Sequence, residues 1–137
     1  MNKELLKAFN AMFSRMTKEV LETAPCRIEV ADFINKLKNT STGSATDKNI
    51  VTLDIRTKEE MAFMKFTYGE VLNIEMKDLF TEENISKLDF SKEYIILCRS
   101  GARAIAISTT LSLLGFKAIA LKGGWGELSA YLGVKTV

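Results

Sequence analysis

One short segment holds the residues of this sequence that are best suited to do chemistry. Cys98 is followed by a polar loop that contains Arg99, Gly101 and Arg103. A cysteine reacts as its thiolate, and nearby guanidinium groups favour that ionised form. Unpaired backbone amides of the loop and of the first helical turn would stabilise negative charge on the sulfur as well. We therefore predict that Cys98 is a nucleophile; the alternative interpretation is a buried structural cysteine at the end of a strand.

The segments on either side of this loop must position the thiol. Tyr94–Leu97 is apolar and β-favouring, which predicts a buried strand, and Ala102–Leu114 has helical apolar spacing and ends at Gly115. Cys98 then lies at the carboxyl end of a strand, where ligands bind in open α/β folds. The amides expected to bind an anionic substrate belong to six consecutive residues, Arg99, Ser100, Gly101, Ala102, Arg103 and Ala104.

The loop resembles a known active site. Cys98–Arg103 is similar to the active-site loop of the rhodanese-like sulfurtransferases, which has the form C-R-x-G-x-R. The resemblance extends from near Ile28 onward. It includes Asp54–Met61, similar to the family pattern D-V-R-x-x-x-E-[FY], and Gly123–Trp125, similar to G-G-[WY].

Three residues outside the loop are expected to support the site. Asp54 and Arg56 end a β-branched strand, Ile50–Arg56, so they should lie at the same carboxyl rim as the loop. We expect them to form a structural ion pair with a minor electrostatic effect on the pocket. Trp125 follows two glycines that let the backbone turn sharply, and we expect it in the core or in the pocket wall.

One segment departs from the family pattern. Phe66–Val71 stands where the family usually carries G-H-[IV]-P-G-A, and it contains neither His nor Pro. The pattern leaves open what lines that side of the pocket, and Phe66 and Tyr68 are the candidates.

The composition narrows the class of protein. The 137 residues suffice for one domain, and the net charge of +2 gives no reason to expect nucleic acid or an acidic membrane as a partner. The absence of histidine removes Ser-His-Asp and Cys-His catalysis and histidine-ligated metal sites. We expect both cysteines, Cys26 and Cys98, to be reduced, which suits a cytoplasmic location. No apolar run is long enough to span a bilayer, and the N-terminus does not resemble a signal peptide.

Strand-like and helix-like segments alternate along the chain. The expected strands lie near residues 28, 51, 72, 95 and 119, and the segments between them predict helices at Asp32–Lys38, Lys58–Phe66, within Leu79–Leu88, at Ala102–Leu114 and around Leu128–Leu132. Such alternation predicts an α/β domain whose parallel sheet is covered on both faces. The resemblance implies five strands with the Cys98 strand in the centre. Asn39–Asn49 is small and polar and predicts a surface loop, and Phe80, Ile85 and Leu88 are expected to face inward.

An amphipathic helix is predicted ahead of this domain, over Lys3–Thr23. We therefore divide the chain into a helical extension, residues 1–24, and a rhodanese-like domain, residues 25–137. The helix carries an apolar stripe made of Leu5, Leu6, Phe9, Met12, Phe13, Met16 and Val20. We expect this stripe to pack on the domain's own surface; the alternatives are a homodimer contact and a flap near the active site.

The resemblance implies a sulfurtransferase of the thiosulfate (rhodanese) type that uses no metal and no organic cofactor. A small anionic sulfur donor, thiosulfate or a persulfide, would load Cys98 as a persulfide, and cyanide, a thiol or a partner protein would accept the sulfur. Arg99 and Arg103 would attract the donor, or Arg103 would turn inward and brace the loop. One alternative is a module that relays sulfur to a partner protein without catalysis. The other is a cysteine phosphatase or arsenate reductase, whose C-x5-R loop is one residue longer than the C-x4-R formed here.

Overall fold

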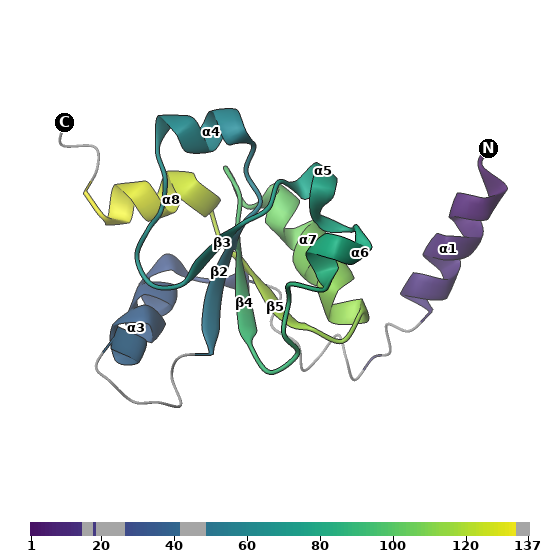
Figure 1. Ribbon diagram of the computed structural model, residues 1–137, viewed down its shortest axis with the longest axis horizontal. Coiled ribbons are helices and arrows are strands. Elements are labelled where there is room, and N and C mark those ends of the chain that lie inside the picture. The colour runs from purple at the N-terminus through teal and green to yellow at the C-terminus, as the bar shows by residue number, and fades with distance from the viewer. Residues whose placement is uncertain (15–17, 19–26, 42–48, 134–137) are drawn as a thin grey trace.

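Figure 1 shows a computed structural model of the chain, which describes residues 1–14, 18, 27–41 and 49–133. The strands are β1 (Arg27–Ile28), β2 (Ile50–Asp54), β3 (Val71–Asn73), β4 (Glu93–Leu97) and β5 (Lys117–Leu121). The helices are α1 (Lys3–Phe13), α3 (Val30–Ser41), α4 (Lys58–Phe63), α5 (Met76–Leu79), α6 (Glu82–Ile85), α7 (Ala102–Leu113) and α8 (Gly124–Tyr131). Within these ranges, no helix has both the length and the apolar character needed to cross a bilayer.

The strands form one parallel sheet in the order β1-β5-β4-β2-β3. β4 lies in the middle, and its Ile95 pairs with Thr52 of β2 on one side and with Ile119 of β5 on the other. Parallel strands that are buried on both faces require nearly continuous apolar sequence, which β4 has over Tyr94–Leu97. The predicted five-stranded α/β fold, with the Cys98 strand in its centre and a helix at the N-terminus, is confirmed.

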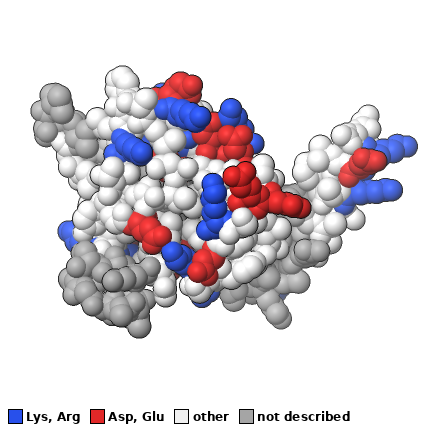
Figure 2. Space-filling model, in the orientation of Figure 1, with Lys and Arg blue, Asp and Glu red and all other residues white. Residues whose placement is uncertain are grey.

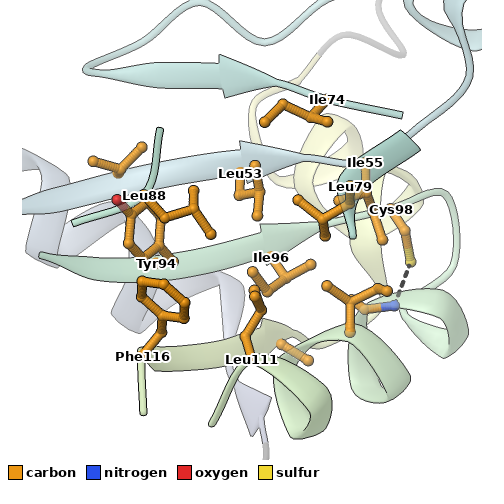
Figure 3. Packing of buried hydrophobic residues seen from close by; sticks show 14 residues of the cluster. Leu53, Ile55, Ile74, Leu79, Leu88, Tyr94, Ile96, Cys98, Leu111 and Phe116 are labelled. Carbon is orange, nitrogen blue, oxygen red and sulfur yellow. Dashed lines mark hydrogen bonds between the residues drawn. The ribbon is translucent and has the colours of Figure 1, made fainter. Parts of the chain in front are cut away.

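Successive residues of β4 face opposite layers of the protein. Ile96 belongs to a cluster with Leu111 of α7, whereas Ile95 belongs to a second cluster with Phe33 of α3. In Figure 1, α5, α6 and α7 lie on one side of the sheet, and α3 and α8 lie on the other. Figure 3 shows the first of these clusters. Each fully buried Leu, Ile or Phe contributes about 1.5–3 kcal/mol relative to an exposed one, so β4 is anchored on both faces.

The boundaries of the first strand and helix differ from the prediction. β1 is short because the chain already enters α3 at Val30, and α3 continues to Ser41, beyond the predicted end at Lys38. The helix therefore takes in the first residues of the predicted loop at 39–49, and residues 42–48 of that loop lie outside the described residues. Phe33, Ile34 and Leu37 form the inward face of this helix, because all three are buried.

The segment between β3 and β4 holds two short helices instead of one. The inward position predicted for Phe80 is wrong, because the preceding Leu79 occupies the buried site and Phe80 is 45% exposed where the chain leaves α5. Leu88 is buried, and Ile85 packs against the same cluster. Thr81 caps α6, since its side chain accepts a hydrogen bond from the backbone of Asn84 at 3.1 Å.

Helix α1 contributes nothing to the core of the domain. None of its residues is buried, and Leu5, Leu6, Phe9 and Phe13 are between 46% and 52% exposed. In Figure 1 this helix stands apart from the sheet and from the helices that cover it. Over Lys3–Phe13, the expectation that the apolar stripe packs on the domain's own surface is therefore wrong. Residues 15–17 and 19–26, which contain the rest of the predicted helix, lie outside the described residues.

Because α1 buries no side chain, the variant Phe9→Ser should change the free energy of unfolding by less than about 0.5 kcal/mol, as exposed sites usually do. The same replacement at Phe33, which is fully buried, should cost about 3–5 kcal/mol. Urea denaturation followed by Trp125 fluorescence measures both values. A loss at Phe9 as large as the loss at Phe33 would show that α1 is part of the core.

Candidate active site

The sulfur of Cys98 lies directly after the carboxyl end of β4. The side chain is fully buried, and Figure 3 places it beside Ile55 and Leu79. Two backbone amides donate to Sγ, that of Gly101 at 3.0 Å and that of Ala104 at 3.4 Å. Among the described residues, these two amides alone form the predicted cradle. N–H groups that converge on one atom favour negative charge there, which suits a thiolate.

The turn after β5 holds the start of this loop. The amide of Trp125 donates to the carbonyl oxygen of Cys98 at 2.7 Å, and that of Gly126 donates to the carbonyl oxygen of Arg99 at 3.2 Å. Gly124 has a φ of +56°, and a side chain there would collide with the Cys98 carbonyl and lie 2.8 Å from the carbonyl carbon of Arg99. The close approach of the two backbone segments therefore requires glycine at this position.

Gly101 is needed at the corresponding point of the loop itself. Its φ is +100°, and it immediately precedes the first residue of α7. A Cβ at this position would lie 3.1 Å from the backbone nitrogen of Gly123, so the loop and the turn are packed backbone against backbone. This packing places the amide of Gly101 where it can reach the sulfur.

Arg103 braces the loop against helix α4. Its guanidinium donates two parallel hydrogen bonds to the carboxylate of Glu60, at 3.0 and 2.9 Å. These bonds hold the pKa of Glu60 at about 2, against an ordinary value of 4.5. Glu60 also accepts a hydrogen bond from the backbone of Thr57 at 3.0 Å, as part of the capping box of α4. Of the two roles considered for Arg103, the structure shows the bracing contact.

The other predicted binding residues lie around the outside of the loop. Arg99, Ser100 and Ala102 are exposed, and Ala104 is buried against the sulfur. Within the described part of the chain, Arg99 forms no ion pair, so its charge remains available to an anion that approaches the loop.

Asp54 and Arg56 form the predicted structural ion pair. Arg56 donates from Nε and from Nη2 to the Asp54 carboxylate at 2.9–3.2 Å, and the two side chains are 2% and 0% exposed. The guanidinium carbon of Arg56 lies 4.6 Å from the centre of the Trp125 ring. The pair therefore supports Trp125, whose amide holds the Cys98 carbonyl.

A cleft of about 640 Å³ opens beside the loop. It is lined by the end of the β2 segment, the start of α4, the start of α5 and one loop residue: Ile55, Thr57, Lys58, Glu59, Glu75, Met76, Lys77 and Arg103. Of these, Ile55 lies next to the sulfur in Figure 3, and Arg103 precedes the residue whose amide binds it.

The two aromatic residues considered for the pocket do not line this cleft. Phe66 is buried on the other side of the sheet, where its ring centre lies 5.8 Å from that of Phe33, and Tyr68 is 45% exposed. Without the family's His and Pro, this segment contributes Phe66 to the core instead. Cys26 lies outside the described residues, and no three His, Cys, Asp or Glu side chains within the described ranges are grouped to hold a metal.

The sequence pattern identified the loop but missed one of its supports and part of the cleft wall. The support is Glu60, the partner of Arg103. The missed wall residues are Lys58 and Met76, which line the cleft. The position of Glu60 in the pattern that begins at Asp54 was the one available signal for the first of these.

The chain is similar in sequence and in fold to known proteins. Residues 37–131 match the family of rhodanese-like domains. The chain is 33% identical over 78 residues to a Bacillus subtilis protein named "Putative sulfurtransferase YtwF". The aligned region covers 57% of this chain and 72% of that protein. A rhodanese-related protein from Thermoplasma volcanium has a solved structure with a TM-score of 0.62 and 24% identity, over 77% of this chain and 92% of that one. An NAD-dependent persulfide reductase from A. fulgidus has a TM-score of 0.56 and 24% identity, over 89% of this chain and 18% of that one.

The fold and the site thus define an α/β protein with a cysteine held at the carboxyl end of its central strand. The family match spans more than half of the chain, so the protein belongs to the rhodanese-like domain family. The likenesses to solved structures show the shared fold. The resemblance predicted from the Cys98 loop is confirmed.

The variant Gly124→Ala should be destabilised by about 2–4 kcal/mol, because it combines a positive φ with a clash against the Cys98 loop. Gly126→Ala is the matched control: its new Cβ would lie 3.8 Å from the Arg99 carbonyl oxygen, an ordinary contact. The control should be neutral or slightly stabilising, since alanine favours a helix. Equal unfolding free energies for the two variants in urea titrations would contradict the close approach described here.

The variant Glu60→Gln should lose the ion pair with Arg103. Because the pKa of Glu60 is about 2 in the folded protein and 4.5 ordinarily, its stabilisation is fully present above pH 4.5 and is lost as the pH falls toward 2. We expect the original chain to be more stable than the variant by about 1–2 kcal/mol at pH 7 and to lose this advantage near pH 2. Denaturation curves at pH 7, 4 and 2.5 measure the difference. Glu59→Gln is the control: Glu59 is exposed and its carboxylate forms no ion pair with any described residue, so the difference in stability should not change with pH in this way.

Proposed function

We propose that the protein is a sulfurtransferase that moves sulfane sulfur through a persulfide on Cys98. The observation that carries the proposal is the pair of backbone N–H groups, from Gly101 and Ala104, that donate to Sγ. Such donors stabilise an anionic sulfur in the way an oxyanion hole stabilises oxygen. Membership of the rhodanese-like domain family supports the same reaction class.

The reaction needs two displacements at sulfur. With thiosulfate as donor, the Cys98 thiolate attacks the outer sulfur, the S–S bond of thiosulfate breaks, and sulfite leaves with the electron pair. The protein then carries Cys98–S–S⁻. In the second step the thiolate of an acceptor, or cyanide, attacks the outer sulfur of this persulfide. The S–S bond breaks, and the Cys98 thiolate is restored.

The charges around the loop suit an anionic donor. Arg99 is exposed and has no carboxylate partner among the described residues, so it can attract the donor. Arg103 keeps the loop in shape through Glu60. Because the Cys98 side chain is fully buried, the donor reaches the sulfur only when the residues that cover it shift.

The buried sulfur favours one second candidate, a relay module for the same sulfur. In that case a partner protein would move the covering residues, and turnover with small molecules alone would be slow. The phosphatase alternative is disfavoured. The chemistry of a phosphatase needs an arginine that binds the oxyanion, whereas both terminal guanidinium nitrogens of Arg103 donate to Glu60.

Incubation with thiosulfate should add the mass of one sulfur atom to the intact protein, and cyanide should remove it and yield thiocyanate. Cys98→Ala should abolish both effects, because the persulfide then has no carrier. Cys26→Ala is the matched control and should load and unload as the original chain does.

Full turnover by Cys98→Ala would refute the proposal. Loading without turnover, followed by release to a partner protein, would favour the relay module. Hydrolysis of an aryl phosphate without any persulfide would favour the phosphatase.

A further inference from the structure

Helix α1 presents an apolar stripe that the domain of its own chain does not bury. The stripe is made of five residues at helical spacing, all of them exposed or half-buried: Leu5, Leu6, Phe9, Met12 and Phe13. In Figure 2 the charged side chains of this helix gather on the side that points away from the domain. The helix has 11 residues, and an isolated helix of fewer than about 12–15 residues is marginal in water. Helix α1 therefore needs a surface on which its stripe can pack.

Helix α7 carries an uncharged outer face. This face is made of residues that lie opposite the buried side of the helix: Ile105, Ala106, Thr109, Ser112 and Leu113. Ile105 is 40% exposed. The only charged residue of α7 is Arg103, whose guanidinium is already bound to Glu60. Because the exposed side of a helix usually carries charged residues, an uncharged one is typical of a contact with protein.

The stripe of α1 and the outer face of α7 match in spacing and in size. The intervals between residues are the same in both sets, so each set runs about 12 Å along its helix. The stripe holds only large side chains, whereas the face of α7 includes three small ones, Ala106, Thr109 and Ser112. Large side chains of one helix fit into the grooves that small residues leave on another. Two α1 stripes packed together would instead set large side chains against large ones.

The available area also favours α7 as the surface that receives α1. Four side chains of the stripe are about half exposed. They offer on the order of 400 Å² per helix, since an aromatic side chain alone carries about 150–250 Å². A pair of α1 helices would bury on the order of 800 Å², less than the roughly 1,200–2,000 Å² of a stable interface. A reciprocal contact of α1 with α7 occurs twice in a dimer and buries on the order of 1,500 Å².

We propose that two copies of this chain form a symmetric dimer in which the α1 stripe of each copy packs on the outer face of α7 of the other. Lys7 lies about 200° around the helix from Phe9, so its ammonium stays in water. The contact includes neither of the amides that donate to the sulfur, which belong to Gly101 and Ala104. The proposal therefore does not depend on the proposed function.

An anionic lipid surface is the other partner that an amphipathic helix can have. Helices that bind such surfaces are rich in Lys and Arg on their polar side. Over its described length α1 has Lys3 and Lys7 against Glu4, so its attraction to anionic lipid is weak. A lipid surface would also leave the outer face of α7 uncovered. A second copy of the chain satisfies both faces at once.

Sedimentation equilibrium of the full chain over a range of concentrations should show a monomer–dimer equilibrium. Phe9→Glu and Ile105→Glu each place a charge in the contact and should raise the dissociation constant at least about a hundredfold, because the loss occurs twice in the dimer. Lys7→Glu is the matched control, since it puts the same residue on the opposite side of α1 and should leave the dissociation constant unchanged. Neither Phe9 nor Ile105 is buried in one copy, so these variants should still fold.

Urea denaturation gives the dimer a second signature. The unfolding midpoint of the original chain should rise with protein concentration, and that of Phe9→Glu should not. In dilute protein, where the chain is monomeric, the two should have the same free energy of unfolding, because α1 buries nothing in one copy. A midpoint of the original chain that does not change with concentration would overturn the proposal.

Photocrosslinking identifies the surface that receives α1. With p-benzoylphenylalanine in place of Phe9, in a mixture of ¹⁴N- and ¹⁵N-labelled chains, mass spectrometry should find mixed-label crosslinks to peptides of α7. Crosslinks to α1 of the other copy would overturn the assignment to α7, and crosslinks within one copy would overturn the dimer. A chain that is monomeric at every concentration and binds phosphatidylglycerol vesicles, with binding weakened by Lys7→Glu, would assign the stripe to lipid instead.

Discussion

The close backbone contact between the Cys98 loop and the turn after β5 is the constraint on which the site depends. Trp125 donates to the Cys98 carbonyl at 2.7 Å, and Gly124 leaves no space for a side chain between the two segments. The same turn packs against Gly101, and the amides of Gly101 and Ala104 donate to the sulfur. The polarity around the sulfur is thus built from main-chain groups whose positions are set by packing.

The three arginines near the sulfur have different roles. Arg56 is buried on Asp54 beneath the Trp125 ring, and Arg103 is tied to Glu60. Both therefore hold polypeptide segments in place, and their charges are largely compensated. Arg99 alone of the three is exposed and has no carboxylate partner in the described part of the chain. The proposed displacement at sulfur is compatible with a chain without histidine, because it needs an ionised thiol and N–H donors but no side-chain general base.

The surroundings of the loop distinguish this chain from the general pattern of its family. Phe66–Val71 lacks the His and Pro of that pattern, and its Phe66 is buried beside Phe33. The cleft is instead lined from α4 and α5, by Lys58 and Met76 among others. Differences in specificity within one fold arise in such loops and helix ends, because the side chains of the sheet are needed to fill the core.

The sequence by itself determined the architecture and the position of the thiol. Continuous apolar runs such as Tyr94–Leu97 require a strand buried on both faces, and the glycines of the loop and turn report backbone conformations that only glycine adopts easily. These are local properties, so they can be read from neighbouring residues. Only the tertiary structure decided that Arg103 meets Glu60, that Phe80 and α1 stay exposed, and which side chains line the cleft beside the Cys98 loop. Those outcomes depend on contacts between segments far apart in sequence. The number of residues between two such segments does not determine how far apart they lie in space.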